Sequence, residues 1–287
     1  MRSRRVIFAG NRFFVLKEML DVGMNIQKIL AVQGSHLAKE LITRNIEHIA
    51  IASKKEFVEY LDALEFNDFV ANGCPYILPP THLAREGKRF INIHPSYLPD
   101  LRGADPVPGA LLFGRDSGAT CHLMDAGVDT GPIISQVCIP YSQDLDASLL
   151  YQLSFTAERE VFHRALERDF LPVKTQETKN DLLYYTKKPD DLQIDFTQSA
   201  EAIIRRIRAF GNPSQGAFFT IGDAVFKVYD AEIVTNPYLL AKIQDYEDNT
   251  VVMAYEKTLL IKKGSGYLKL KNIIGDFSLV ETGLMLL

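Results

Sequence analysis

The first half of the chain alternates short β-branched segments with segments of helical periodicity, and this alternation limits the folds open to it. The β-branched segments, which we predict to be strands, are residues 6–9, 29–32, 46–51 and 69–71. Between them, apolar residues recur three and four positions apart, which is the helical period. These helical segments are residues 13–20, 37–44 and 57–64. Alternating strands and helices form right-handed crossovers, so we expect a mostly parallel sheet with helices on both faces.

The rest of the chain predicts that this Rossmann-like α/β domain is followed by a small β-rich domain. Three further strands and a long helix continue the first pattern, at residues 89–93, 119–124, 132–139 and 146–168. The segment 174–195 is rich in Lys, Thr, Asn and Asp, which is typical of a linker. A helix at 200–209 and several strands come next, with a hairpin signal at Gly264-Ser265-Gly266. We expect a large domain over residues 1–180, a linker over 181–195 and a helix-plus-β domain over 196–287.

Composition argues against several classes of protein. The 287 residues contain 32 Lys and Arg against 36 Asp and Glu, a net charge of −4, whereas proteins that bind nucleic acid usually carry a basic excess. Cys74, Cys121 and Cys138 form no Cys-x-x-Cys pair, so we expect neither a disulfide framework nor a metal site. No apolar run reaches the ~18 residues that a membrane-spanning helix needs. We therefore expect a cytoplasmic protein that binds neither nucleic acid nor membrane.

The first predicted strand ends at Gly10-Asn11-Arg12, and ligands of parallel sheets bind beyond such strand ends. This segment lacks the G-x-G-x-x-G pattern that holds the pyrophosphate of a dinucleotide. The chain also lacks the P-loop, the G-x-S-x-G nucleophile elbow and the H-E-x-x-H zinc motif. These absences exclude NAD enzymes, P-loop kinases, α/β-hydrolases and zincins as first hypotheses.

The end of the predicted strand at 89–93 carries two polar residues, Asn92 and His94, directly before Pro95. Because side chains alternate along a strand, both lie on one face, roughly 6.5 Å apart along the backbone. Pro95 favours an extended conformation at His94. An amide beside an imidazole suits acyl transfer, since the amide can donate to an oxyanion and the imidazole can accept a proton. The alternative is a structural pair at a strand end.

A glycine-rich turn, Met124 to Gly131, contains two carboxylates, Asp125 and Asp129. One of them could orient His94 and stabilise its protonated form, as the third member of a triad does. The alternative is that Asp and Gly here only form a tight turn. Between the pair and the turn, Arg102 is either an anion contact or a solvated loop arginine.

Taken together, three segments resemble the formyltransferases that use 10-formyltetrahydrofolate. They are Asn92-Ile93-His94-Pro95-Ser96-Tyr97-Leu98-Pro99, Arg102-Gly103-Ala104-Asp105-Pro106 and Met124-Asp125-Ala126-Gly127-Val128-Asp129-Thr130-Gly131-Pro132. The resemblance implies the formyltransferase fold and the formylation of an amine, with Asn92, His94 and Asp129 as the catalytic residues. It implies that Asn92 donates to the oxyanion and that His94, held by Asp129, accepts the proton of the amine.

The same resemblance implies where the formyl donor, 10-formyltetrahydrofolate, binds. The folate would lie against a Gly/Pro loop and the turn before Pro132, whose exposed backbone groups can match the donor–acceptor edge of a pterin. The implied contacts are Gly73, Cys74, Pro75, Tyr76, Ile77, Leu78, Asp125 and Val128. We interpret Cys74 as a small packing residue, the usual role of a lone cysteine.

Features outside the three motifs distinguish the branches of this family. A second domain argues against the short purine-pathway enzymes. Residues 190–287 hold ten Lys and Arg against thirteen Asp and Glu, which is a poor surface for tRNA. The segment Val32 to His36 passes directly into the next helix, where the tRNA enzymes usually carry a longer basic insertion. The segment 184–191 resembles sugar N-formyltransferases, so we expect a UDP- or dTDP-linked amino-deoxy sugar as the acceptor.

The implied acceptor contacts are Asn11, Arg12, Ser96, Tyr97, Arg102, Gly103, Tyr185 and Lys187. The overall likeness favours a UDP-4-amino-4,6-dideoxy sugar on a route to a nonulosonic acid such as pseudaminic acid, and hence surface polysaccharide biosynthesis. Three alternatives remain: a methionyl-tRNA formyltransferase, a formylation domain of a peptide synthetase, and a non-catalytic formylfolate-binding module. The C-terminal strands form either a homodimer surface or a second ligand site.

Overall fold

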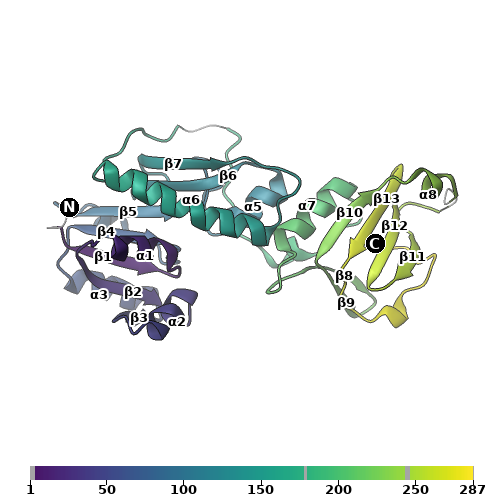
Figure 1. The fold of residues 1–287 in the computed structure, drawn as a ribbon, viewed down its shortest axis with the longest axis horizontal. Coiled ribbons are helices and arrows are strands. Elements are labelled where there is room, and N and C mark those ends of the chain that lie inside the picture. The colour runs from purple at the N-terminus through teal and green to yellow at the C-terminus, as the bar shows by residue number, and fades with distance from the viewer. Residues whose placement is uncertain (1–3, 178–179, 243–245, 287) are drawn as a thin grey trace. The chain divides into compact units, whose positions relative to one another are not determined.

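The computed structural model describes residues 4–177, 180–242 and 246–286. The chain divides into two compact units (Figure 1). The first unit comprises Met1–Pro106, Asp116–Pro140 and Gln152–Tyr185. The second unit comprises Val107–Arg115, Tyr141–Tyr151 and Thr186–Leu287. No helix within the described ranges is both long and apolar enough to cross a membrane.

The first unit is built around a seven-stranded sheet in the order β3-β2-β1-β4-β5-β6-β7. Its strands are β1 (Val6–Gly10), β2 (Ile26–Val32), β3 (Ile49–Ile51), β4 (Asp68–Asn72), β5 (Arg89–His94), β6 (Ser117–Leu123) and β7 (Ile133–Ile139). Strands β1 to β5 pair in parallel, whereas β6 and β7 join the sheet in antiparallel pairs. The predicted mostly parallel sheet is confirmed.

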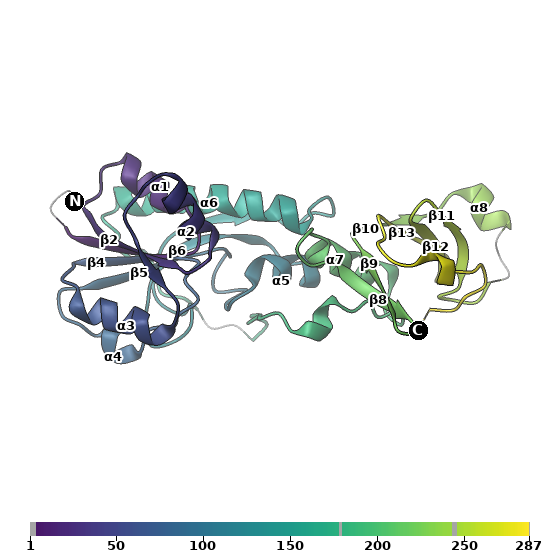
Figure 2. The ribbon, with the colours of Figure 1, turned by 90° about the horizontal axis from the view of Figure 1, so that it is seen from below.

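Helices cover both faces of this sheet, as Figure 2 shows for α1 and α6 on one side and α3 and α4 on the other. The helices are α1 (Phe14–Asp21), α2 (His36–Thr43), α3 (Lys54–Ala63), α4 (Pro80–Leu83) and α6 (Ala147–Glu167). Alternate side chains of β1 serve the two faces: Val6 and Phe8 pack in the cluster of α1, α2 and α6, while Ile7 and Ala9 pack with α3. Because both faces are covered, all five residues of β1 are buried.

Two predicted strands differ from the observed strands at their ends. The segment predicted at 46–51 is a strand only from Ile49, because the N–H of Ile46 donates to the carbonyl of Leu41 at 2.9 Å and closes the end of α2. Strand β2 begins at Ile26, before its predicted start at Ile29. The polar side chains of Gln27 and Lys28 interrupt the apolar pattern there, so the pairing with β1 was not visible in the sequence.

The second unit contains a four-stranded antiparallel sheet in the order β10-β13-β12-β11 and a separate hairpin, β8-β9. Its strands are β8 (Ala217–Ile221), β9 (Ala224–Val228), β10 (Asp230–Val234), β11 (Val251–Tyr255), β12 (Thr258–Lys263) and β13 (Gly266–Lys271). Its helical segments are α5 (Pro106–Phe113), α7 (Ala200–Phe210), α8 (Pro237–Lys242), η1 (Pro189–Leu192) and η2 (Phe277–Leu279). The predicted hairpin is confirmed, since β12 pairs with β13 and Lys263 lies opposite Gly266.

The segment predicted as a linker, residues 181–195, contains local structure. Tyr184 forms a parallel bridge with Arg102, and the N–H of Tyr185 donates to the carbonyl of Arg102 at 2.8 Å. The 3₁₀ turn η1 follows, and the N–H of Ile194 donates to the carbonyl of Phe218 at 2.6 Å. The bonds of Tyr184 and Tyr185 to Arg102 position the loop that carries Gly103, which lines the candidate site.

Candidate active site

A cavity of about 300 Å³ lies in the first unit, at the carboxyl ends of β1, β4 and β5. This is where ligands of open parallel sheets bind, and the volume suits a small-molecule site. One part of its wall is apolar and includes Phe69, Leu83 and Met124. The predicted site residues that line it are Asn11, Arg12, Gly73, Cys74, Pro75, Tyr76, Ile77, Leu78, Asn92, His94, Gly103, Asp125, Val128 and Asp129.

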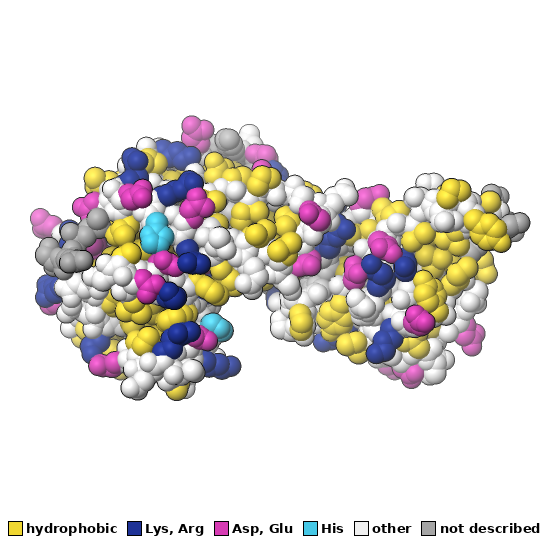
Figure 3. All heavy atoms as spheres, in the orientation of Figure 1, with side chains coloured by type: hydrophobic (Ala, Val, Ile, Leu, Met, Phe, Trp, Pro, Cys, Tyr) yellow, Lys and Arg dark blue, Asp and Glu magenta, His cyan; other side chains and the backbone are white. Residues whose placement is uncertain are grey.

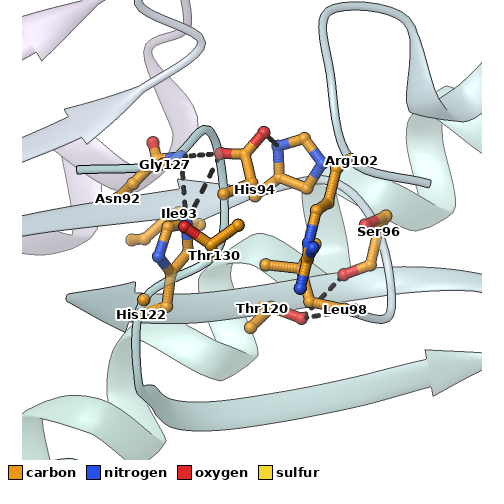
Figure 4. Close-up of polar contacts among 12 residues, drawn as sticks. Asn92, Ile93, His94, Ser96, Leu98, Arg102, Thr120, His122, Gly127 and Thr130 are labelled. Carbon is orange, nitrogen blue, oxygen red and sulfur yellow. Dashed lines mark hydrogen bonds and ion pairs between the residues drawn. The ribbon is translucent and has the colours of Figure 1, made fainter. Parts of the chain in front are cut away.

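Strand β5 brings Asn92 and His94 into this cavity together, as the two-residue spacing predicted. In the register with β6, Asn92 lies opposite His122 and His94 lies opposite Thr120. Asn92 is half-buried and donates its amide Nδ2–H to Oδ1 of Asp129 at 3.1 Å (Figure 4). His94 is buried, with only 6% of its side chain exposed.

The turn between β6 and β7 contains two carboxylates with different roles: Asp125 stabilises the turn itself, and Asp129 points toward the catalytic candidates. Asp125 is exposed and accepts hydrogen bonds from the backbone N–H of Gly127 at 3.1 Å and from the hydroxyl of Thr130. This is the tight-turn role of an Asp beside Gly. Asp129 instead has a left-handed backbone, with φ of 55°, and directs a mostly buried carboxylate to Asn92 and His94. The structure thus separates the two roles that the sequence left open for this pair.

Four polar groups lie around the Asp129 carboxylate, belonging to Asn92, Gly103, His94 and His122. Besides Asn92, the backbone N–H of Gly103 donates to Oδ2 at 3.2 Å, and Nδ1 of His94 lies 3.6 Å from Oδ2. Burial alone would raise the pKa of Asp129, but the protonated forms that His94 and His122 take at low pH, together with the Gly103 N–H, outweigh it and hold that pKa well below its usual range. Asp129 is therefore an ionised carboxylate near neutral pH.

His94 is held at both ring nitrogens. Its Nε2 lies 3.0 Å from the carbonyl oxygen of Leu101, which can only accept, so Nε2 carries the hydrogen and donates. Nδ1 then presents its lone pair at the cavity, beside Asp129. Burial lowers the pKa of His94, and although the Asp129 charge raises it, the charges of His122 and Arg12 lower it further. The resting imidazole is therefore neutral, with a carboxylate in place to stabilise its protonated form.

His122 is a site residue that the sequence reasoning missed. It lies on β6, lines the cavity, and its Nδ1 donates to the carbonyl of Leu123 at 2.8 Å. Its Nε2 is therefore an acceptor in the neutral ring, and Nδ2 of Asn92 lies 3.3 Å from it. The same Nε2 lies 3.6 Å from Oδ1 of Asp129. The available signal was its position in a predicted strand, seven residues before Asp129, but only the pairing of β5 with β6 places it beside Asn92.

Arg12, after β1, is joined to a second missed residue, Glu158 of α6. The guanidinium forms an ion pair with the Glu158 carboxylate, whose side chain is fully buried, and lies over the ring of Phe155 at 5.5 Å. Burial raises the pKa of Glu158, although the Arg12 charge and the Asn72 amide lower it. Gly73 permits the close approach of the neighbouring Asn11 side chain, because a Cβ there would lie 2.1 Å from Oδ1 of Asn11 and the backbone φ is +67°.

Five predicted acceptor contacts are not in the wall of this cavity. They are Ser96, Tyr97, Arg102, Tyr185 and Lys187. Ser96 is fully buried and donates to the carbonyl of Asp100 at 2.9 Å, so it shapes its own loop. Arg102 donates from Nη2 to Oε1 of Gln176 at 2.9 Å, and Tyr185 is 7% exposed. Sequence motifs do not specify which side of a loop faces the cavity: in the loop after Pro95, Gly103 and Ala104 line it, whereas Ser96, Tyr97 and Arg102 do not.

Cys74 lines the cavity, but burial raises the pKa of its thiol to about 11. A thiol with that pKa is protonated at neutral pH and is a weak nucleophile. Within the described residues, no group of three or more His, Cys, Asp or Glu side chains could hold a metal ion. The polar side of the cavity therefore holds an imidazole base (His94), an ionised carboxylate (Asp129) and an amide donor (Asn92) beside an apolar wall. These are the groups that acyl transfer to a nucleophile requires.

Comparison with known proteins assigns both parts of the chain to one family. The family profile of the formyl transferase N-terminal region matches residues 29–166, and that of the formyl transferase C-terminal domain matches residues 187–275. A methionyl-tRNA formyltransferase of Legionella pneumophila is 31% identical over 218 residues, which cover 73% of this chain and 68% of the relative. A methionyl-tRNA formyltransferase of Coxiella burnetii is 27% identical over 291 residues, which cover 94% of this chain and 90% of the relative.

Among solved structures, the fold is similar to that of an N-formyltransferase from Helicobacter canadensis in complex with folinic acid and dTDP-3-aminofucose. The TM-score is 0.71 at 17% sequence identity, and the match covers 94% of this chain and 99% of the other. The matched profiles, the level of identity over most of the chain and the shared fold agree. This chain is a formyltransferase and belongs to the formyltransferase family.

Proposed function

We propose that this enzyme transfers the formyl group of 10-formyltetrahydrofolate to the primary amine of a nucleotide-linked amino-deoxy sugar. Formyl transfer itself follows from the family. The formyl donor is supported by the Helicobacter canadensis relative, whose structure contains folinic acid. It is also supported by the cavity, where the apolar wall at Phe69, Leu83 and Met124 can cover a flat heterocycle and residues 73–78 form another part of the wall.

The proposed mechanism uses the three residues that converge on Asp129. The neutral acceptor amine attacks the formyl carbon, forming a new C–N bond, while Nδ1 of His94 accepts one proton of the amine. The Asp129 carboxylate stabilises the imidazolium that results. Asn92 donates from Nδ2 to the formyl oxygen as negative charge develops there, using the hydrogen now directed to His122, its longer contact at 3.3 Å. The bond from the formyl carbon to the folate nitrogen then breaks, and that nitrogen takes up the proton held by His94, which returns to its neutral form.

The arrangement of charge in the second unit is the observation that supports an amino sugar rather than tRNA as the acceptor. Lys269 and Lys271 on β13 form ion pairs with Glu232 on β10 at 3.0 Å each, and Lys271 also pairs with Asp230 at 2.8 Å. Figure 3 shows basic side chains interspersed with acidic ones on the face displayed. A tRNA-binding surface needs cations that are free to neutralise phosphates. Cations that are already paired favour a small acceptor over a polynucleotide.

The connection between β2 and α2 supports the same acceptor class. Strand β2 ends at Val32 and α2 begins at His36, with Ser35 as the N-cap that accepts the N–H of Ala38 at 3.2 Å. This tight turn leaves no room for a basic insertion of the kind that the tRNA enzymes usually carry there. The narrower expectations, a UDP-4-amino-4,6-dideoxy sugar, a role in surface polysaccharide biosynthesis, a cytoplasmic location and a homodimer, stay predictions.

The test is to incubate the enzyme with 10-formyltetrahydrofolate and a panel of UDP- and dTDP-linked amino sugars, with methionyl-tRNA in parallel. We expect one or more amino sugars to gain the mass of a formyl group, with formation of tetrahydrofolate at the same rate. Formylation of methionyl-tRNA without formylation of any amino sugar would contradict the proposed acceptor.

Methionyl-tRNA formylation is the second candidate function. It is favoured by sequence identity, since the Legionella pneumophila and Coxiella burnetii relatives are both methionyl-tRNA formyltransferases. The same panel decides between the two candidates, because both share the formyl donor and differ only in the acceptor.

A further inference from the structure

The segment Leu101 to Gly103 contacts both His94 and Asp129, the two titratable residues of the candidate catalytic site. The carbonyl of Leu101 accepts from Nε2 of His94 at 3.0 Å. The backbone N–H of Gly103 donates to Oδ2 of Asp129 at 3.2 Å. Arg102 lies between these two contacts but does not line the cavity (Figure 4). Its side chain therefore has a role other than direct contact with substrate.

Arg102 is connected to Asp129 a second time, through Gln176. Nη2 of Arg102 donates to Oε1 of Gln176 at 2.9 Å. Nε2 of Gln176 in turn donates to the backbone carbonyls of Asp129 at 2.9 Å and Gly131 at 2.8 Å. The contacts close a ring, from the Asp129 carbonyl through Gln176 and Arg102 to Gly103 and back to the Asp129 carboxylate.

The backbone at both ends of this ring needs such support. Asp129 has φ of 55°, a left-handed conformation that a residue with a side chain rarely adopts unless its surroundings hold it. The Arg102 backbone is held by the N–H of Tyr185 and by the carbonyl of Leu183, which accepts the Arg102 N–H at 3.1 Å. Gln176 thus joins a strained turn to a loop that is itself anchored.

The distance from Nδ1 of His94 to Oδ2 of Asp129 is 3.6 Å, longer than a hydrogen bond. Asp129 therefore has no strong bond to His94 that would restore its position after a displacement. Its orientation toward the imidazole depends on the Gly103 and Asn92 contacts to its carboxylate and on the Gln176 contacts to its backbone.

We propose that Arg102 and Gln176 form a positioning pair that holds the Asp129 carboxylate against His94 for formyl transfer. This proposal depends on the proposed catalytic roles of Asp129 and His94, but it does not depend on which amine is the acceptor. Neither residue was assigned this role by the sequence, where Arg102 was an acceptor contact and Gln176 was not singled out.

The experiment compares Gln176→Ala, Arg102→Ala and the double variant in steady-state formyl transfer. We expect each single variant to lower kcat by about tenfold to a hundredfold, because a displacement of about 1 Å at a catalytic group has that effect. We expect KM for 10-formyltetrahydrofolate and for the acceptor to stay within about twofold, since the pair does not line the cavity. The double variant should be no slower than the slower single variant, because the two residues act through one path.

Two further measurements separate positioning from loss of structure. Arg102→Lys keeps a donor for Gln176 and should recover part of the activity that Arg102→Ala loses. In Gln176→Ala the acid limb of kcat should move to lower pH, because the Asp129 charge no longer raises the pKa of His94 as strongly, while His122 and Arg12 continue to lower it. A purely structural role would lower the amount of folded enzyme and leave this limb in place.

Gln176→Met fills a similar volume without the amide, so it tests the same contacts if Gln176→Ala does not fold. Gln27→Ala is the matched control, since Gln27 is exposed and its amide donates to the nearby Asn25, and it should keep full activity. Wild-type kcat in folded Gln176→Ala or Gln176→Met, or additive losses in the double variant, would overturn the positioning pair. An enzyme that formylates only methionyl-tRNA would overturn the proposed acceptor instead, and the same variants would then be assayed with that acceptor.

Discussion

The guanidinium of Arg12 pairs with the carboxylate of Glu158, a side chain of α6 that has no exposed surface. The pair joins the residue that follows β1 to a helix 146 positions later, at the wall of the candidate site. Oε2 of Glu158 and Oδ1 of Asn72 are also buried, without a hydrogen-bond partner among the described residues. A buried carboxylate in such surroundings depends on its single cationic partner.

Arg12→Ala should therefore destabilise the fold by about 3–5 kcal/mol near neutral pH, because it leaves the Glu158 charge buried and unpaired. The pKa of Glu158 is already raised, and removal of Arg12 raises it further. An acid whose folded pKa exceeds its unfolded pKa costs stability above the unfolded value, so the deficit should shrink as pH falls toward about 5. Urea unfolding of both proteins at the two pH values measures this.

Lys17→Ala is the control for this prediction, since it removes an exposed ion pair with Asp21, in which both side chains are more than half exposed. That loss should stay below about 1 kcal/mol at either pH. A similarly small loss in Arg12→Ala, or a deficit that does not change with pH, would show that Glu158 does not depend on Arg12.

Asn92→Ala should lower kcat by about a hundredfold to a thousandfold, the effect of removing one oxyanion donor. The variant also removes a hydrogen bond to the Asp129 carboxylate, so the position of that carboxylate changes as well. Asn25→Ala is the matched control, because the Asn25 amide oxygen accepts from Gln27 and does not line the cavity. Turnover of folded Asn92→Ala close to that of Asn25→Ala would remove Asn92 from the mechanism.

The pH profile should report the neutral form of His94. Burial lowers its pKa from the ordinary value of about 6.5, so the acid limb of kcat that belongs to His94 should lie below about pH 6.5, where the imidazole becomes protonated. Asp129 stays ionised throughout, because its pKa lies below the usual range. The acceptor amine must also be neutral and adds a limb of its own, so the limb of His94 is the one that moves when the Asp129 charge is removed, and a profile in which no limb moves is incompatible with this assignment. Asp129→Asn should move the limb to still lower pH, since it removes the charge that raises the pKa of His94.

Alkylation should distinguish the cysteines without loss of activity. Cys138 is exposed, whereas the pKa of Cys74 is raised to about 11 and Cys121 is fully buried. Iodoacetamide at about pH 8 should therefore label Cys138 first, and the singly labelled enzyme should remain active. Peptide mass spectrometry with parallel assays follows both quantities, and Cys138→Ser should abolish the first labelling step. Inactivation in step with early labelling of Cys74 would show a reactive thiol in the cavity.

Local sequence determined the elements and several site positions for reasons that act over a few residues. Helical and two-residue periodicity specify which side chains share a face, and this places Asn92 and His94 on one side of β5. The Asp-Gly pattern of the turn before Pro132 specifies a tight connection, in which Asp125 bonds to Gly127 and Thr130. Short-range patterns of this kind can be recognised because the interacting groups are neighbours in the chain.

Tertiary structure alone decided which distant residues complete the site. His122 meets Asn92 through the register of β5 with β6, Glu158 meets Arg12 because α6 packs beside the end of β1, and Gln176 reaches Asp129 from the segment after α6. Each contact depends on strand order and helix packing, which arise from burial of apolar surface across the whole unit and leave no periodic signal at these polar positions. The sequence therefore determined the strand ends that could carry chemistry, and packing determined which partners set their charge and orientation.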